Sequence, residues 1–223
     1  MEKKMPEKIS IDYYSDTLCV WAWIAQPRLE ELDSKWGEQI EINHHFVDIF
    51  GNSNKKIPAR WGETDGYEKF AAHVEHSAAE FERATVNPSI WRDTRPNSSA
   101  QSHLLLRAAG TGPDAAQLPM LALAIRKAFF CDAQNISDME VLFSIAEEQN
   151  FDVNHLRKSL QDGSALAALT SDLKQAIDLG VRGSPTWILN SGRQVLYGNV
   201  GYRILNANIE ELLAHPSDEA SWC

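Results

Sequence analysis

Strand patterns lie near the two ends of this 223-residue chain, and a long helical run separates them. Residues 8–15 and 40–47 alternate apolar and polar side chains as strands do, and residues 20–36 between them have a helical pattern. This β-α-β order leaves enough chain for a right-handed crossover between two parallel strands. The amino-terminal part therefore predicts one half of an α/β domain.

The middle of the chain, from residue 48 to about residue 180, predicts helices without strands. Residues 51–58 contain glycine, asparagine and proline and predict a loop before the first helix. Asn97 can cap a helix, and Ser137 opens a capping box. The candidate helices span residues 64–84, 97–109, 113–132, 138–149, 152–161 and 164–179.

The strand pattern returns after residue 180. Residues 180–190 predict a turn followed by a strand, residues 191–193 a hairpin turn, and residues 194–197 an antiparallel partner strand. A last helix is expected at about residues 202–214. The consecutive helices between two sheet-forming segments suggest a helical insertion.

Cys19 occupies the point where the first predicted strand leads into the first predicted helix. Unpaired backbone N–H groups and the positive end of the helix dipole lie at such a position. A thiol there loses its proton more easily, so we expect the pKa of Cys19 to lie below the free value of about 8.5. The plainer alternative is that Cys19 is a small buried apolar side chain.

Composition and charge exclude several classes of function. The net charge of −10 argues against nucleic acid and against an anionic membrane surface. No apolar run approaches the length that spans a bilayer, and the amino terminus lacks the apolar segment of a secretory signal, so we expect a cytoplasmic location. Cys19, Cys131 and Cys223 are widely spaced, which predicts neither a zinc site nor a disulfide framework.

Three stretches carry a resemblance to a known family: residues 15–21 around Cys19, residues 128–130 with 135–138, and residues 180–186 with the run Gly-Ser-Pro-Thr. With the order of elements, they resemble the thioredoxin-like fold of the DsbA family. Within that family the chain looks most like the cytoplasmic FrnE-type branch. That branch adjoins 2-hydroxychromene-2-carboxylate isomerases and kappa-class glutathione transferases.

The resemblance implies an α/β thioredoxin-like fold with an inserted all-helical domain. Residues 1–55 and 166–216 would form the thioredoxin-like domain, residues 56–165 the helical insertion, and residues 217–223 a loose tail. Pro185 would follow a cis peptide bond and face Cys19. The backbone of Ser184 would then be free to pair with an extended ligand, as in strand addition. From spacing alone, Pro185 is expected to be an ordinary trans proline at the start of an edge strand.

The sequence departs from the family at two places. FrnE-type oxidoreductases carry C-x-x-C, whereas Ala22 stands here in place of the second cysteine. FrnE relatives also tend to have His-Arg where this chain has Ser102 and His103. Because a mixed disulfide must be resolved by a second thiolate, Cys19 cannot complete a dithiol cycle by itself.

Other candidate ligand-binding residues follow from the resemblance. Trp21 lies inside the cysteine motif, whereas Trp23, Trp61, Trp91 and Trp187 are expected mainly to pack. Asn97 matches an active-site asparagine of the isomerase and kappa relatives, although a helix cap is the plainer interpretation. Asn199 and Val200 match a loop that holds the γ-glutamyl carboxylate in glutathione-binding relatives.

The predicted function is that of a DsbA-family thiol-disulfide oxidoreductase-like enzyme with monothiol or glutathione-linked chemistry through Cys19. Glutathione would be a co-substrate rather than a tightly bound cofactor, and the partner a thiol- or disulfide-containing peptide or small molecule. A homodimer is among the expected states, because the relatives include dimers. The alternatives are a glutathione-dependent isomerase or transferase and a non-catalytic peptide-binding module.

Overall fold

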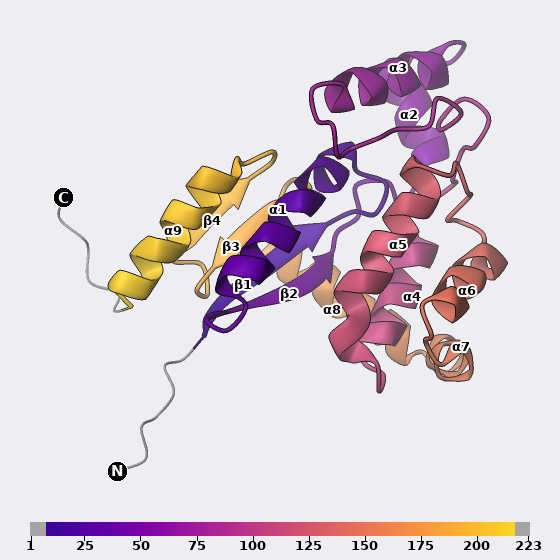
Figure 1. Cartoon of the computed structure of the whole chain (residues 1–223). Coiled ribbons are helices and arrows are strands. Elements are labelled where there is room, and N and C mark those ends of the chain that lie inside the picture. The colour runs from indigo at the N-terminus through magenta and orange to yellow at the C-terminus, as the bar shows by residue number, and fades with distance from the viewer. Residues whose placement is uncertain (1–7, 217–223) are drawn as a thin grey trace.

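The computed structural model describes residues 8–216 (Figure 1). Its centre is a mixed four-stranded sheet in the order β2-β1-β3-β4. β1 pairs in parallel with β2, and β3 runs antiparallel to both β1 and β4. The strands are β1 (Ile9–Ser15), β2 (Ile40–Phe46), β3 (Thr186–Leu189) and β4 (Gln194–Tyr197). The mixed sheet predicted from the element order is confirmed, and the predicted loose tail, residues 217–223, lies outside the described residues.

Helices cover both faces of this sheet. α1 (Val20–Trp36) and α9 (Tyr202–Ala214) pack on one face, where Leu29, Leu205 and neighbouring apolar residues form one buried cluster with β1 and β3. α8 (Ser164–Asp178) packs on the other face, where its Ala176 belongs to one buried cluster with Tyr14 and Ile188. Figure 1 shows the sheet between these two helical layers.

The remaining helices lie between β2 and α8 in the chain and gather beyond the β2 edge of the sheet (Figure 1). They are α2 (Ser53–Trp61), α3 (Gly66–Ala78), α4 (Ala100–Gly110), the 3-10 helix η1 (Ala115–Gln117), α5 (Leu118–Phe130), α6 (Met139–Glu148) and α7 (Val153–Gln161). The division at residues 55/56 and 165/166 stays a prediction, and these boundaries fall inside α2 and α8.

The prediction of a loop over residues 51–58 is wrong, because α2 begins at Ser53. Asn52 caps α2, since its side chain accepts a hydrogen bond from the backbone N–H of Lys55 at 3.1 Å. Pro58 lies inside the helix near its middle. The turn-forming residues that suggest a loop therefore serve as a helix cap here.

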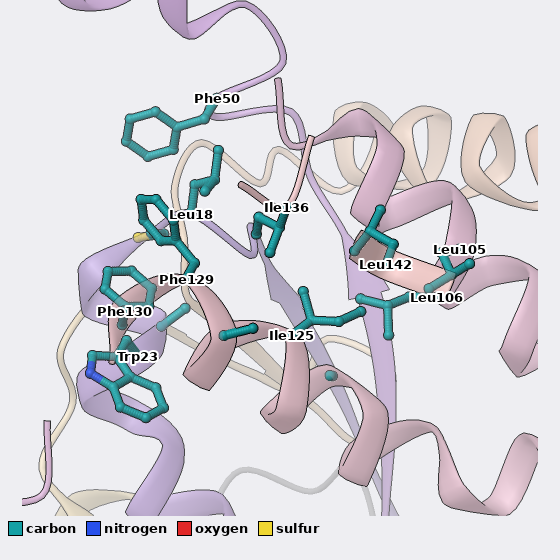
Figure 2. Close-up of a cluster of buried hydrophobic side chains, with 14 of the residues drawn as sticks. Leu18, Trp23, Phe50, Leu105, Leu106, Ile125, Phe129, Phe130, Ile136 and Leu142 are labelled. Atoms are coloured by element: carbon teal, nitrogen blue, oxygen red, sulfur yellow. The ribbon is translucent and has the colours of Figure 1, made fainter. Parts of the chain in front are cut away.

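One large apolar core joins the sheet-bearing part of the chain to the inserted helices. Leu18 and Trp23 belong to the same buried cluster as Ile125, Phe129 and Phe130 of α5 (Figure 2). The rings of Trp23 and Phe130 stack with their centroids 5.6 Å apart. Among the described residues, no helix is both long enough and apolar enough to cross a membrane.

Candidate functional site

Cys19 lies at the N-cap of α1, with its side chain directed at the loop before β3. Its Sγ donates a hydrogen bond to the carbonyl oxygen of Ser184 at 3.2 Å. The Ser184–Pro185 peptide bond is cis. Both the cis bond and the placement of Cys19 against this loop agree with the sequence prediction. The Cys19 residue is only 5% exposed.

The loop that carries Cys19 is held by the buried carboxylate of Asp16. Its Oδ1 accepts from the N–H of Leu18 at 2.8 Å. Its Oδ2 accepts from the N–H groups of Ile49 and Phe50 at 3.0 and 2.8 Å and from the Ser99 hydroxyl at 2.8 Å. This one side chain therefore fixes the start of α1, the chain after β2 and the start of α4 relative to one another.

Further hydrogen bonds hold the same loop from two sides. The Asp16 N–H donates to the Ser184 hydroxyl at 2.9 Å, which ties the loop to the cis-proline segment. The Thr17 N–H donates to Nε2 of His103 at 3.2 Å, and the hydroxyls of Thr17 and Ser102 lie 2.7 Å apart. Burial lowers the pKa of His103, so its ring stays neutral and can accept this bond.

The predicted low pKa of Cys19 is wrong. Burial raises the pKa of its thiol above the ordinary value, and the negative charge of Asp16 adds to this effect. Hydrogen bonding with the Ser184 side chain and with the backbone N–H groups of Ala22 and Trp21 lowers the pKa without compensating for burial. The helix N-terminus therefore stabilises the thiolate less than removal from water destabilises it.

A cavity of about 300 Å³ opens over Cys19. The other residues that line it come from α1, α2, α3, the chain after β2 and the loop before β3: Val20, Trp21, Ile49, Phe50, Lys56, Ile57, Arg60, Trp61, Phe70, His73, Arg182, Gly183 and Ser184. We call this space the Cys19 cavity. The structure thus places Trp21 and Ser184 at the site, as predicted, and adds Trp61, for which packing was expected.

The polar lining of the Cys19 cavity is cationic. Lys56, Arg60 and Arg182 each contribute a positive charge, and no carboxylate is among the lining residues within the described part of the chain. The Nζ of Lys56 donates to the carbonyl of Ile49 and lies 5.3 Å from the centroid of the Phe50 ring. The cavity therefore combines apolar walls with groups that attract an anion.

One family model, described as a DSBA-like thioredoxin domain, matches residues 10–210. The chain belongs to this DSBA-like family. Its fold is accordingly the α/β thioredoxin-like DsbA fold, with a mixed four-stranded sheet and inserted helices.

Curated relatives of this DSBA-like chain include the ClpXP adapter protein SpxH of two bacteria. The protein from Halalkalibacterium halodurans is 26% identical over 194 residues, which are 84% of this chain and 60% of the relative. The protein from Bacillus subtilis is 26% identical over 184 residues, 81% of this chain and 58% of the relative. The chain therefore spans less than two thirds of the length of these relatives.

Solved structures with the same fold include proteins named as isomerases, oxidoreductases and reductases. A putative protein disulfide isomerase from Nitrosomonas europaea has a TM-score of 0.79 at 12% identity, covering 95% of this chain and all of that one. A probable DsbA oxidoreductase from Streptomyces coelicolor has a TM-score of 0.74 at 18% identity, covering 96% and 94%. The cytosolic disulfide reductase DsbM from Pseudomonas aeruginosa, solved with GSH, has a TM-score of 0.66 at 17% identity, covering 92% and 99%.

Three predicted ligand residues are not brought to the Cys19 cavity of this DSBA-like chain. Asn97 is exposed, and its Oδ1 accepts a hydrogen bond from the Asn54 amide at 2.7 Å. Asn199 is exposed in the loop before α9, and Val200 packs against the cluster formed by α1, β1 and α9. For Asn199 and Val200 the structure favours the plainer interpretation, a loop before a helix. Asn97 does not cap α4, which begins at Ala100 with Ser99 at its N-cap.

Asp16, Lys56 and Arg60 were not expected at the site. Asp16 had a signal, because it stands immediately before the cysteine motif in a segment that is otherwise apolar or neutral. Lys56 and Arg60 are four residues apart and share one face of α2, but the prediction of a loop there hid that spacing.

Proposed function

We propose that this protein carries out monothiol, glutathione-linked thiol–disulfide exchange through Cys19. The observation that carries the proposal is a thiol that lines a small cavity together with three cationic side chains and the cis-proline loop. A cavity of about 300 Å³ is of a size that suits a small molecule rather than a large one.

The monothiol character follows from Ala22. This residue stands three positions after Cys19, has no exposed surface and offers no thiol. A second thiolate must therefore come from outside the protein to resolve any mixed disulfide at Cys19.

Glutathione fits the charge of the cavity. It carries two carboxylates and one ammonium group, so its net charge is negative, and Lys56, Arg60 and Arg182 supply the complementary charge. DsbM, which shares the fold, is described in complex with GSH. DsbM is named as a cytosolic protein. A cytoplasmic location of this protein would likewise give it access to glutathione.

The exchange has two balanced steps. The Cys19 thiolate attacks a glutathione mixed disulfide, an S–S bond forms between Cys19 and glutathione, and the other thiol leaves as its thiolate. A second glutathione thiolate then attacks this bond, which releases oxidised glutathione and returns the Cys19 thiolate. Because burial raises the pKa of Cys19, few thiolates form at neutral pH and the first step is slow there.

Mass spectrometry of the protein after incubation with oxidised glutathione tests the proposal. We expect one glutathione on Cys19, removed again by free glutathione. Arg60→Ala should slow the modification roughly tenfold through loss of a charge-assisted contact. Lys55→Ala, which removes an exposed lysine of the same helix that does not line the cavity, is the matched control. An unmodified Cys19, or equal rates in both variants, would refute the proposal.

A second candidate is a peptide-binding adapter. The SpxH relatives are named as ClpXP adapters, and Ala22 removes the thiol that a dithiol enzyme needs. Binding would use the backbone of Gly183 and Ser184, which line the Cys19 cavity. Tight peptide binding that persists in Cys19→Ser, without turnover of any glutathione disulfide, would favour this candidate over the first.

A further inference from the structure

The strand β2 has one free edge. Within residues 8–216, β2 pairs with β1 and with no other strand, and its opposite edge faces the inserted helices (Figure 1). Ile9 N–H donates to the Gln39 carbonyl, and Val47 N–H donates to the Ser15 carbonyl. Odd-numbered residues of this stretch thus direct their backbone groups to β1, and even-numbered residues direct theirs to the free edge.

Two backbone groups on this edge are capped by side chains. The His44 carbonyl accepts from Nη1 of Arg107 at 3.0 Å, and the Phe46 N–H donates to Oδ2 of Asp172 at 3.0 Å. The N–H and carbonyl of Ile42 and the N–H of His44 have no such cap among the described residues. Uncapped groups on an edge strand are a template for another strand.

Space lies beside these uncapped groups. Two cavities of about 530 and 560 Å³ share Ile42, His44, Ala116 and Pro119 in their linings. They therefore adjoin one another along the edge of β2, with η1 and the start of α5 as the opposite wall. We call the two together the β2-edge groove.

The part of the groove next to α1 is rich in hydrogen-bond acceptors. Gln26 is 7% exposed, lines this cavity, and its Oε1 is buried without a hydrogen-bond partner. Asp33, two helical turns further along α1, lines the same cavity and has no ion pair among the described residues, whereas Glu30, one turn along, pairs with Arg83. Burial lowers the pKa of His44 to about 3, so its ring adds no positive charge here.

Positive charges elsewhere in the groove are already neutralised. His45 lies 2.9 Å from Asp172 and 3.4 Å from Asp12, and Arg107 lies 3.5 Å from Asp172. Glu41, which also lines the groove, is exposed. The uncommitted charge of the β2-edge groove is therefore negative, and a cationic occupant complements it.

We propose that the β2-edge groove binds an extended peptide segment that carries a lysine or arginine. The peptide backbone adds a strand to β2 by pairing with Ile42 and His44. The cationic side chain enters the cavity beside α1 and donates to Oε1 of Gln26, and the negative charge of Asp33, two helical turns away, attracts it. Its aliphatic stem packs on Leu29 and Met120, which form part of the apolar wall.

Fluorescence anisotropy tests this site with a short labelled peptide that alternates valine and threonine and carries one central lysine. Wild-type protein should bind it, and Asp33→Lys should weaken binding roughly tenfold through loss of an attractive charge and gain of a repulsive one. Glu31→Lys, an equal charge change on an exposed neighbour outside the groove, is the matched control. Equal affinities of the two variants would overturn the proposal.

Backbone pairing is tested from the side of the peptide, so that protein folding is unaffected. Two peptides are compared, one N-methylated at its odd-numbered residues and the other at its even-numbered residues. One of them should lose binding and the other should keep it, because only one edge of the added strand faces β2. The Ile42 and His44 amides should shift in two-dimensional NMR spectra. Peptide binding that is unaffected by N-methylation, or NMR chemical-shift changes confined to Ser184 and the Cys19 cavity, would refute strand addition.

This site is independent of the redox proposal. Peptide affinity for the groove should be unchanged in Cys19→Ser, whose thiol does not line it. A loss of peptide binding in Cys19→Ser would show that binding depends on the Cys19 thiol and would overturn the inference.

Discussion

The thiol of Cys19 is hydrogen-bonded to the backbone carbonyl of Ser184 across 165 positions of sequence. This contact joins the first helix to the loop before β3, and it engages the thiol proton. Since a carbonyl oxygen accepts only from the protonated thiol, the contact favours the neutral form of Cys19. Any chemistry at this sulfur begins with the loss of that hydrogen bond.

Alkylation of Cys19 should become fast only at alkaline pH. Burial raises the pKa of the thiol, so the thiolate that reacts with iodoacetamide is scarce near neutrality. The rate is measured against pH in a Cys131→Ser, Cys223→Ser background. An apparent pKa of Cys19 below about 8.5 would contradict this expectation.

Ala22→Cys should create dithiol–disulfide activity. Residues three apart on a helix are neighbours, so a sulfur at position 22 can reach Cys19 without large movement of the backbone. We expect the variant to reduce insulin disulfides with a supplied dithiol, and the wild type to show little of this activity. Cys19→Ser serves as the control. A variant that forms the new disulfide and stays inactive would show that the missing thiol is not what limits the wild type.

Asp16→Ala should destabilise the fold and disorder the loop around Cys19. The change leaves the backbone N–H groups of Leu18 and Phe50 and the Ser99 hydroxyl without their acceptor, whereas the Ile49 N–H keeps the Val47 carbonyl. At about 1–3 kcal/mol for each buried unpaired donor, we expect a loss of about 3 kcal/mol or more. Urea unfolding measures the loss.

Asp48→Ala is the matched control for Asp16→Ala. Its exposed carboxylate accepts from the Gly51 N–H at 2.7 Å, and its removal should cost about 1 kcal/mol or less. Equal losses of stability in the two variants would mean that Asp16 does not hold the loop as described.

His45 should make stability depend on pH above neutrality. Burial alone lowers its pKa, but hydrogen bonds to Asp12 and Asp172 and their charges outweigh burial and raise it to about 9. The unfolded value is about 6.5, so the contribution is complete below that pH and is lost as pH rises to about 9.

The measurement for His45 compares unfolding free energies between pH 6 and pH 9.5. His45→Gln should remove most of the alkaline decline, whereas His76→Gln, at an exposed site of α3, should leave it. A wild-type stability that stays constant or increases over this range would contradict the assignment.

Local patterns predicted the sheet and its two flanking helices well. α1 and α9 have the predicted bounds, because each has a glycine at one end, Gly37 after α1 and Gly201 before α9. α2 was not predicted, because Asn52 and Pro58 are residue types that occur in turns as well as in helices. Asparagine both caps helices and forms turns, and only the surrounding packing decides between them.

The residues of the candidate site that lie within one sequence motif could be predicted. The contacts between segments that are distant in the sequence could not. The positions of Cys19, Trp21 and Pro185 followed from the motif and the family resemblance. The partners of Asp16 lie 33, 34 and 83 positions away, and no local pattern joins them. The pKa of Cys19 was misjudged for the same reason, since burial depends on α2, α3 and the cis-proline loop together.

The apolar core that Trp23 shares with Phe130 affects how the protein unfolds. Cutting out the inserted helices would expose one side of α1 to water, and cutting away the sheet would expose α5. Neither fragment retains a closed interior. We therefore expect a single cooperative unfolding transition for the whole chain, in which the inserted helices melt together with the sheet instead of as a separate module.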